Sequence, residues 1–286
     1  MATSHIQRRR VGPAPEAQPV SREIAAADGD RSARFREKVV IVTGASAGIG
    51  LASALLFARE GAQLVLNARG ARRLQAAQNQ VAREGPPPAV VRGDAADRAV
   101  IRRLVTTAER RFGRIDILVN NAGGGSTSRR PFSSLTERDW REMLRANLQS
   151  AFFLSQAVVR VMKRQGRGRI VNVASLAGRQ RSRLSGADYA SAKAGLLALT
   201  RHLAWECGPF GITVNAVAPG VTQTKRIVAK WRRLPAHERA QLLAAIPLRR
   251  LARPEEAASA IAFLASDDAS YITGATLDVN GGCFMG

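Results

Sequence analysis

Short runs of apolar, often β-branched residues alternate along this chain with longer segments whose apolar residues recur at helical spacing. The run Val39–Val42 reads as a buried strand, and the stretch 99–112 carries an apolar stripe typical of a helix packed on one face. The expected strands are 39–42, 64–66, 90–91, 115–119, 170–174, 213–217 and 276–279, and the expected helices are 49–60, 71–83, 99–112, 136–165, 189–206 and 255–265. Strands that alternate with helices build a parallel sheet covered on both faces. We predict an α/β fold with a doubly wound, Rossmann-type parallel sheet.

Two segments depart from this alternation. Residues 1–36 contain Pro13, Pro15, Pro19 and a run of three arginines with little apolar periodicity, and we predict a disordered basic tail. The remainder, 37–286, is expected to be one domain. Within it, the segment 223–250 is amphipathic and apolar enough to cover a substrate as a lid. A helix pair packed on the core would show the same pattern.

Composition changes the picture mainly through charge. The 286 residues carry 44 Lys+Arg against 22 Asp+Glu, a net charge of +22, and only five of the 44 are lysines. Such a field attracts anions, but the arginines are scattered and accompany no nucleic-acid-reading motif, so we expect no specific nucleic acid. The chain shows neither a membrane-length apolar run nor a secretory signal, and its two cysteines make no disulfide framework. We therefore expect a cytoplasmic protein. We also expect no metal site, because the three histidines lie far apart in the sequence.

A glycine-rich turn follows the first expected strand. Its sequence is Thr43-Gly44-Ala45-Ser46-Ala47-Gly48-Ile49-Gly50, and a helix begins directly after it. Glycines in this place allow a tight turn and close backbone approach, while the helix N-terminus favours a pyrophosphate. The context predicts a dinucleotide site. The expected second strand ends at Arg69 with no carboxylate between Gly61 and Arg83, which favours NADP(H) over NAD(H) because nothing there repels a 2′-phosphate.

Tyr189 and Lys193 form the most informative pair. In a helix, residues four apart share a face, so a phenol and an ammonium would meet. A nearby positive charge lowers the pKa of a Tyr toward the range useful for proton transfer. We therefore interpret the pair as a tuned proton donor. A surface Tyr beside a solvated Lys fits the spacing as well.

From about Lys38 to Gly282 the chain resembles the short-chain dehydrogenase/reductase superfamily, and within it the 3-oxoacyl-(acyl-carrier-protein) reductases. The resemblance rests on motifs in the family's order: the glycine turn at 44–50, Asn120-Asn121-Ala122-Gly123, Asn147, Ser175, Tyr189-x3-Lys193 and Pro219-Gly220-x3-Thr224. It implies an oxidoreductase that moves a hydride between a nicotinamide and a ketone or secondary alcohol. It also implies a homotetramer assembled through the helices at 136–165 and 189–206 and the strand at 276–279.

The resemblance also implies roles for single residues. Tyr189 would exchange a proton with the substrate oxygen, Lys193 would lower the pKa of Tyr189 and bind the nicotinamide ribose, Ser175 would orient the substrate, and Asn147 would support a proton relay. Asp94 would contact the adenine. The expected cofactor-binding residues are Gly44, Ser46, Gly48, Ile49, Gly50, Arg69, Asp94, Ala95, Asn121, Ala122, Gly123, Tyr189, Lys193, Pro219, Gly220, Val221 and Thr222.

Two features leave the choice of cofactor and the substrate open. Ala47 stands where many NADP-using relatives carry a basic residue, so the cofactor prediction depends on Arg69. Arg179, Arg181 and Arg183 make a dense positive segment before Tyr189, which would attract an anionic substrate or an acidic acyl-carrier protein, or simply face solvent. A cofactor-binding regulator without turnover, and a nucleic-acid or membrane binder acting through the tail, remain as alternatives.

Overall fold

The computed structural model describes residues 33–125, 131–182 and 184–286. Most of the expected tail and Arg183 lie outside the described residues. The folded domain begins slightly before residue 37: Phe35 is buried and packs edge-on against Phe57, with ring centroids 4.7 Å apart. Arg34 beside it forms an ion pair with Glu60 at 2.6 Å. The residues just before the first strand therefore belong to the core.

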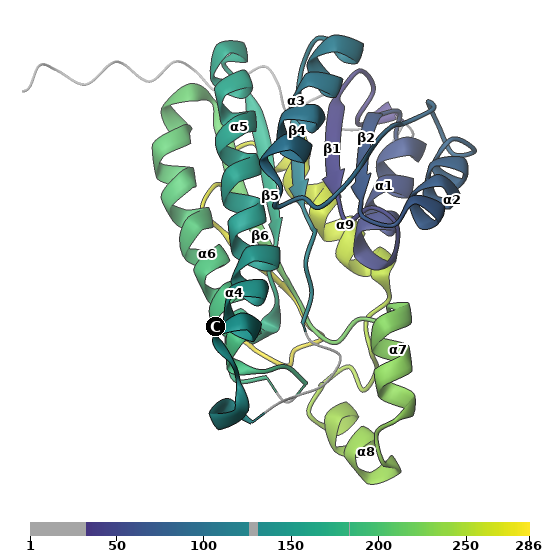
Figure 1. Cartoon of the computed structure of the whole chain (residues 1–286), viewed down its shortest axis with the longest axis vertical. Helices are drawn as coiled ribbons and strands as arrows, with labels where there is room; N and C mark the ends of the chain where they lie inside the picture. Colours follow the sequence, from purple (N-terminus) through teal and green to yellow (C-terminus); the bar gives the residue numbers. More distant parts are fainter. Residues whose placement is uncertain (1–32, 126–130, 183) are drawn as a thin grey trace, which may run out of the picture. The chain divides into compact units, whose positions relative to one another are not determined.

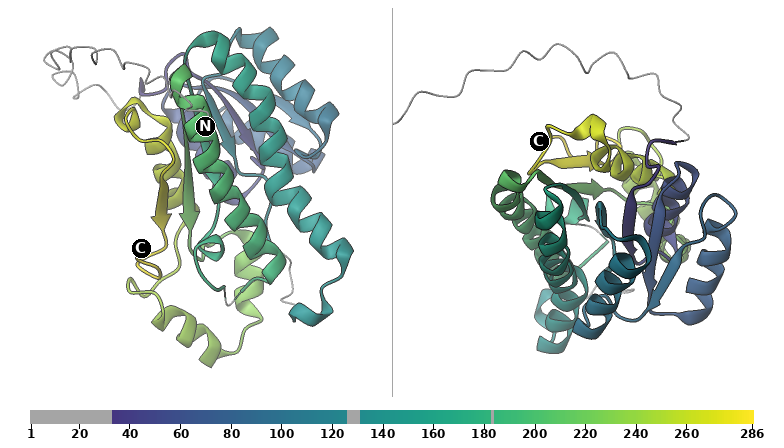
Figure 2. Two further views of the ribbon diagram at one scale, coloured as in Figure 1. Left: turned by 90° about the vertical axis from the view of Figure 1, so that its left-hand side faces the viewer. Right: turned by 90° about the horizontal axis from the view of Figure 1, so that it is seen from above.

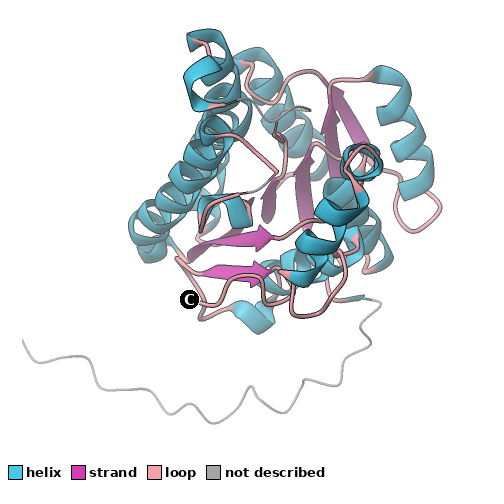
Figure 3. Cartoon of the chain, turned by 90° about the horizontal axis from the view of Figure 1, so that it is seen from below, coloured by secondary structure: helices cyan, strands magenta, loops and turns pink. Residues whose placement is uncertain are grey.

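Seven parallel strands form one sheet in the order β3-β2-β1-β4-β5-β6-β7 (Figures 1 and 3). They are β1 (Val39–Thr43), β2 (Gln63–Ala68), β3 (Ala89–Arg92), β4 (Ile117–Asn120), β5 (Gly168–Val173), β6 (Ile212–Pro219) and β7 (Thr276–Val279). This arrangement confirms the predicted doubly wound sheet. The strand order reverses between β1 and β4, and such a switch point opens a crevice at the carboxyl ends of the strands.

Helices cover both faces of the sheet. Helices α1 (Gly48–Arg59), α2 (Ala71–Val81) and α9 (Pro254–Ala265) share one apolar core with Val40 and Val42 of β1. Helices α3 (Arg98–Phe112), α5 (Ser150–Gln165) and α6 (Ala187–Cys207) share the other with Val39 and Ile41. Figure 2 shows α5 and α6 side by side along that face. Because side chains of a strand alternate between faces, the uninterrupted run 39–42 fills both cores.

A buried polar network joins helices α5 and α6 to the sheet. The Asn120 side-chain amide at the end of β4 donates to Ser155 Oγ and to Asn172 Oδ1, both at 2.9 Å. The Asn172 amide in turn donates to Thr200 Oγ1 of α6 at 2.9 Å. A polar group in such a place is tolerated only with its partners present. The network therefore fixes α5 and α6 relative to the strand ends.

Two regions differ from the helix predictions. The expected helix at 136–165 is divided into α4 (Glu137–Leu144), a π-helical turn at Arg145–Gln149 and α5. The segment 223–250 contains two short helices, α7 (Lys225–Arg232) and α8 (Ala236–Ala244), which extend beyond the carboxyl ends of the strands in Figure 1. No helix within the described ranges is both long and apolar enough to cross a membrane.

Candidate active site

The glycine turn forms the floor of the crevice. Gly44 adopts a left-handed φ of 65°, and a Cβ on Gly50 would overlap the Asn121 amide and the Gly44 carbonyl oxygen. Helix α1 begins at Gly48, and its N-cap residue Ala47 provides no side-chain cap. The first N–H groups of α1 therefore have no side-chain acceptor at this position and suit an anion such as a pyrophosphate.

Thr43 holds the turn against the loop after β4. Its hydroxyl accepts hydrogen bonds from the backbone N–H groups of Asn121 (3.0 Å) and Ala122 (2.9 Å) and donates to the Val119 carbonyl at 3.2 Å. The Asn121 amide returns a hydrogen bond to the Thr43 carbonyl at 2.8 Å. The Asn-Ala-Gly segment after β4 is thus hydrogen-bonded to the end of β1, and these are the two strands at the switch point.

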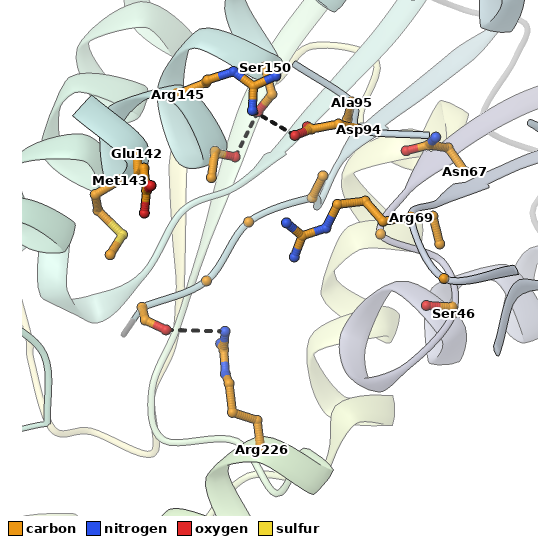
Figure 4. Close-up of a pocket in the computed structure, with 18 of the residues that line it drawn as sticks. Ser46, Asn67, Arg69, Asp94, Ala95, Glu142, Met143, Arg145, Ser150 and Arg226 are labelled. Atoms are coloured by element: carbon orange, nitrogen blue, oxygen red, sulfur yellow. Dashed lines mark hydrogen bonds and ion pairs between the residues drawn. The ribbon is translucent and has the colours of Figure 1, made fainter. Parts of the chain in front are cut away.

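A cavity of about 1090 Å³ lies over the carboxyl ends of β1, β2 and β3, and we call it the β1–β3 cavity. Figure 4 shows the Arg69 side chain extending into it and Asp94 paired with Arg145 beside it. The Asp94 carboxylate accepts from the Ala96 N–H at 2.9 Å and forms an ion pair with Arg145 at 2.7 Å. Burial acts to raise the pKa of Asp94, but these two contacts outweigh it and the pKa is lowered. The expected residues that line this cavity are Gly44, Ser46, Arg69, Asp94, Ala95, Ala122 and Gly123.

A second cavity of about 900 Å³ adjoins the first and contains the expected catalytic residues; we call it the catalytic cavity. Ser175 follows β5, while Tyr189 and Lys193 lie on α6, and all three side chains line the cavity. Of the expected cofactor-binding residues, Gly44, Gly48, Ile49, Asn121, Gly123, Pro219, Gly220, Val221 and Thr222 line it as well. Gly50 lines neither cavity; it lies against Asn121 and Gly44, where there is no room for a side chain.

The pair on α6 has the expected geometry but different electrostatics. Lys193 is buried, lies 5.8 Å from the Tyr189 ring centroid and donates to the Val173 carbonyl at 2.7 Å. Burial raises the pKa of Tyr189, although a hydrogen bond with Ser175 and the charge of Arg226 act in the opposite direction. Burial, with Arg226, lowers the pKa of Lys193 to about 7. The predicted lowering of the Tyr189 pKa is therefore not found, because burial of the phenol outweighs the groups that favour the phenolate.

Asn147 occupies the π-helical turn and is fully buried. Its Oδ1 accepts from the Gly124 N–H at 2.8 Å, and its amide donates to the Met143 carbonyl at 3.0 Å. Its side chain lines neither cavity. In this arrangement Asn147 fixes the glycine loop that separates the two cavities, and π-helical turns are frequent at functional sites.

No motif in the sequence pointed to Arg226, the second residue of α7. This arginine lines both cavities and reaches across the crevice, where its guanidinium donates to the Gly125 carbonyl at 3.4 Å (Figure 4). Arg179 and Arg181, from the positive segment before Tyr189, lie in different surroundings in the fold. Arg179 turns away to pair with Asp278 at 3.2 Å and stacks over Phe284, whereas Arg181 lines the catalytic cavity.

Comparison with known proteins agrees with this geometry. Residues 44–283 match the family model described as "Enoyl-(Acyl carrier protein) reductase". The chain is 40% identical over 251 residues to 3-oxoacyl-[acyl-carrier-protein] reductase FabG of Escherichia coli (strain K12), covering 88% of this chain and 99% of that protein. The chain belongs to the short-chain dehydrogenase/reductase superfamily. Like other members, it is an oxidoreductase that acts on CH–OH or C=O groups with a nicotinamide cofactor.

Other members of the superfamily match over similar lengths. Cis-4-hydroxycyclohexanecarboxylate dehydrogenase of Sinomonas cyclohexanicum is 40% identical, covering 87% of this chain and 97% of that protein. The crystal structure of 3-oxoacyl-[acyl-carrier protein] reductase from Brucella melitensis ATCC 23457 superimposes with a TM-score of 0.82 at 29% identity, covering 90% of this chain and 95% of that one. Relatives with different substrates thus share the fold and the length of the chain.

Proposed function

We propose that this protein is an NADP(H)-dependent oxidoreductase that interconverts a ketone and a secondary alcohol. The observation that carries the proposal is the convergence of Ser175, Tyr189 and Lys193 on one cavity that adjoins the glycine turn. The Ser175–Tyr189 hydrogen bond brings two hydroxyl donors to one place, where a carbonyl oxygen would receive both.

The proton chemistry follows from the burial of these groups. Because burial raises its pKa, Tyr189 keeps its proton at neutral pH and is the proton donor, not the acceptor, when a ketone is reduced. A bound reduced nicotinamide supplies the hydride. As negative charge grows on the carbonyl oxygen, Ser175 stabilises it by hydrogen bonding and Tyr189 transfers its proton. Lys193, whose pKa is about 7, lies beside the phenol and would stabilise the resulting phenolate once protonated.

The preference for NADP(H) is supported by the residues that follow β2. Arg69, Arg72 and Arg73 all line the β1–β3 cavity, and the last residue of β2 beside them is Ala68. A 2′-phosphate bound there would meet cations, and a ribose 2′-hydroxyl would find no carboxylate between Gly61 and Arg83. We expect a higher kcat/KM with NADPH than with NADH, and an Arg69→Ala variant should reduce that ratio.

The substrate class is proposed from the shape and relatives of the site. Leu242, Ile246 and Ile227 from the 223–250 segment line the catalytic cavity, which suits a substrate with an apolar body. The matched relatives are named for a 3-oxoacyl thioester and for a hydroxycyclohexanecarboxylate. We propose a 3-oxoacyl thioester or a related ketone, with an acyl-carrier protein as a candidate partner.

The test is a spectrophotometric assay of NADPH and NADH oxidation with a panel of ketones and 3-oxoacyl thioesters. Tyr189→Phe should lose at least about a hundredfold in kcat and still bind NADPH, because only the transferable proton is removed. Tyr271→Phe is the matched control, since Tyr271 is fully exposed. Unchanged turnover in Tyr189→Phe, or no turnover of any ketone by the wild type, would contradict the proposal.

We also propose that the protein forms a homotetramer. Phe152 of α5 and Trp205 of α6 are exposed aromatic residues on the two helices expected to form the interface. Burying them between subunits would remove this apolar surface from water. A monomeric mass by light scattering would refute the assembly.

A further inference from the structure

The two adjoining cavities differ in charge. The β1–β3 cavity is lined by both signs, with Asp94, Asp139, Glu142 and Asp188 among its arginines. The described lining of the catalytic cavity contains no Asp or Glu. Its cationic residues are Arg73, Arg181, Lys193, Arg226, Lys230 and Arg233. A cavity with walls of one sign concentrates ligands of the opposite sign.

Apart from Lys193, Arg226 is the cation of this cavity whose charge acts on the reacting groups. Its charge acts on both Tyr189 and Lys193, and its guanidinium lies against the glycine loop beside the Tyr189 ring. Within the described part of the chain Arg226 makes no ion pair with a carboxylate, and its hydrogen bond to the Gly125 carbonyl, at 3.4 Å, is long. A guanidinium offers several donors in a planar fork, and that geometry suits a carboxylate or a phosphate.

Arg181 and Lys230 lie where the catalytic cavity meets a neighbouring groove. They line that groove with Leu234 and Glu238, and the Lys230 ammonium donates to the Leu184 carbonyl. The catalytic cavity therefore has Arg226 near Tyr189 and two further cations at its border with the groove. Apolar side chains, among them Ile227 and Leu242, also line the catalytic cavity.

We propose that the substrate carries an anionic group, a carboxylate or a phosphate, which Arg226 binds while Ser175 and Tyr189 hold the reacting carbonyl oxygen. This inference rests on the proposed ketone reduction and adds the charge of its substrate. A carboxylate near the carbonyl would reach Arg226 alone. A phosphate on a longer thioester arm would extend toward Arg181 and Lys230 as well.

The experiment compares pairs of substrates in which one member carries an anionic group and the other lacks it. An aliphatic oxo acid is paired with its methyl ester, and a 3-oxoacyl-CoA with the matching N-acetylcysteamine thioester, which lacks phosphates. The wild type should favour the anionic member of at least one pair by about tenfold or more in kcat/KM. A preference in the first pair identifies a carboxylate, and a preference in the second a phosphate.

Variants then assign the preference to Arg226. Arg226→Met should bring the ratio close to one, and Arg226→Lys should restore part of it, because the charge returns without the fork. Arg232→Met is the matched control: Arg232 is exposed on the same helix and lines neither cavity. It should leave the ratio at the wild-type value.

Three results would overturn the inference. They are equal use of both members of each pair by the wild type, a ratio that survives in Arg226→Met, and an equal loss on all four substrates with a raised KM for NADPH. The last result would assign Arg226 to the cofactor phosphates. Each of these leaves ketone reduction standing, whereas no turnover of any substrate by the wild type would instead refute the proposed function.

Discussion

Replacing Lys193 by methionine tests how strongly the fold disfavours the charge of this side chain. Lys193 is 3% exposed, and burial lowers its pKa from 10.5 to about 7. In the unfolded chain the same group keeps its proton up to about pH 10.5. Between these values the unfolded state binds more protons than the folded state, so the free energy of unfolding of the wild type rises with pH.

The size of this rise in the free energy of unfolding follows from the pH interval between the folded and unfolded pKa values of Lys193. The slope has half its full value at the folded pKa and approaches about 1.4 kcal/mol per pH unit above it, so the rise from pH 7 to pH 9 is about 2 kcal/mol. Well below pH 7 both states are protonated and the contribution is constant. Lys193→Met has no titrating group here. It also loses the hydrogen bond to Val173, which shifts its stability without reproducing the dependence on pH.

The assay is urea unfolding without cofactor, followed by tryptophan fluorescence at pH 6, 7, 8 and 9 and at one protein concentration. The free energy of the wild type minus that of Lys193→Met cancels the other titrating groups. This difference should change by less than about 0.5 kcal/mol from pH 6 to 7 and rise by about 2 kcal/mol from pH 7 to 9. Lys225→Met, which changes an exposed lysine, should give a flat difference throughout. A flat difference for Lys193→Met would refute the reasoning.

Two further changes test the cofactor site and the buried network. Asp94→Asn should weaken NADPH binding about tenfold in a fluorescence titration, because an adenine amino group loses a charged acceptor; an unchanged Kd would remove Asp94 from the adenine site. Asn120→Ala should lower the free energy of unfolding by about 2–4 kcal/mol, because it leaves the Asn172 side-chain oxygen and the Ser155 hydroxyl buried without this donor. Chemical denaturation measures that loss, and a change under about 0.5 kcal/mol would show that water or local movement replaces the amide.

Local patterns predicted the elements of this fold well because each pattern reports a local cause. The run Val39–Val42 is apolar on both faces, since a central parallel strand is buried on both. The four-residue spacing of Tyr189 and Lys193 placed both on one face of α6. The break of the expected helix at Arg145–Gln149 was missed because a π-helical turn has no distinct hydrophobic period.

The electrostatics of the site could not be read from spacing. The adjacency of Tyr189 and Lys193 predicted a lowered Tyr189 pKa, but burial of both groups reversed it. Arg179 and Arg181 look equivalent in the sequence, yet one pairs with Asp278 near the C-terminus and the other lines the catalytic cavity. Burial and charge partners depend on distant segments, which a local pattern does not report.

The sequence by itself determined the alternation of strands and helices, the glycine turn before α1 and the residues that we propose carry proton transfer. Those features depend on short-range sterics, helix periodicity and residue chemistry. Only the tertiary structure decided that Arg226 of α7 faces Gly125 across the crevice, because 101 positions separate them and the packing of α7 brings them together. It also decided that the charged residues lining the cavity around Tyr189 are all cations among the described residues. The positive charge of this cavity is the strongest indication of the charge of the substrate. It arises from the packing of the chain, because packing decides which charged side chains line the same cavity.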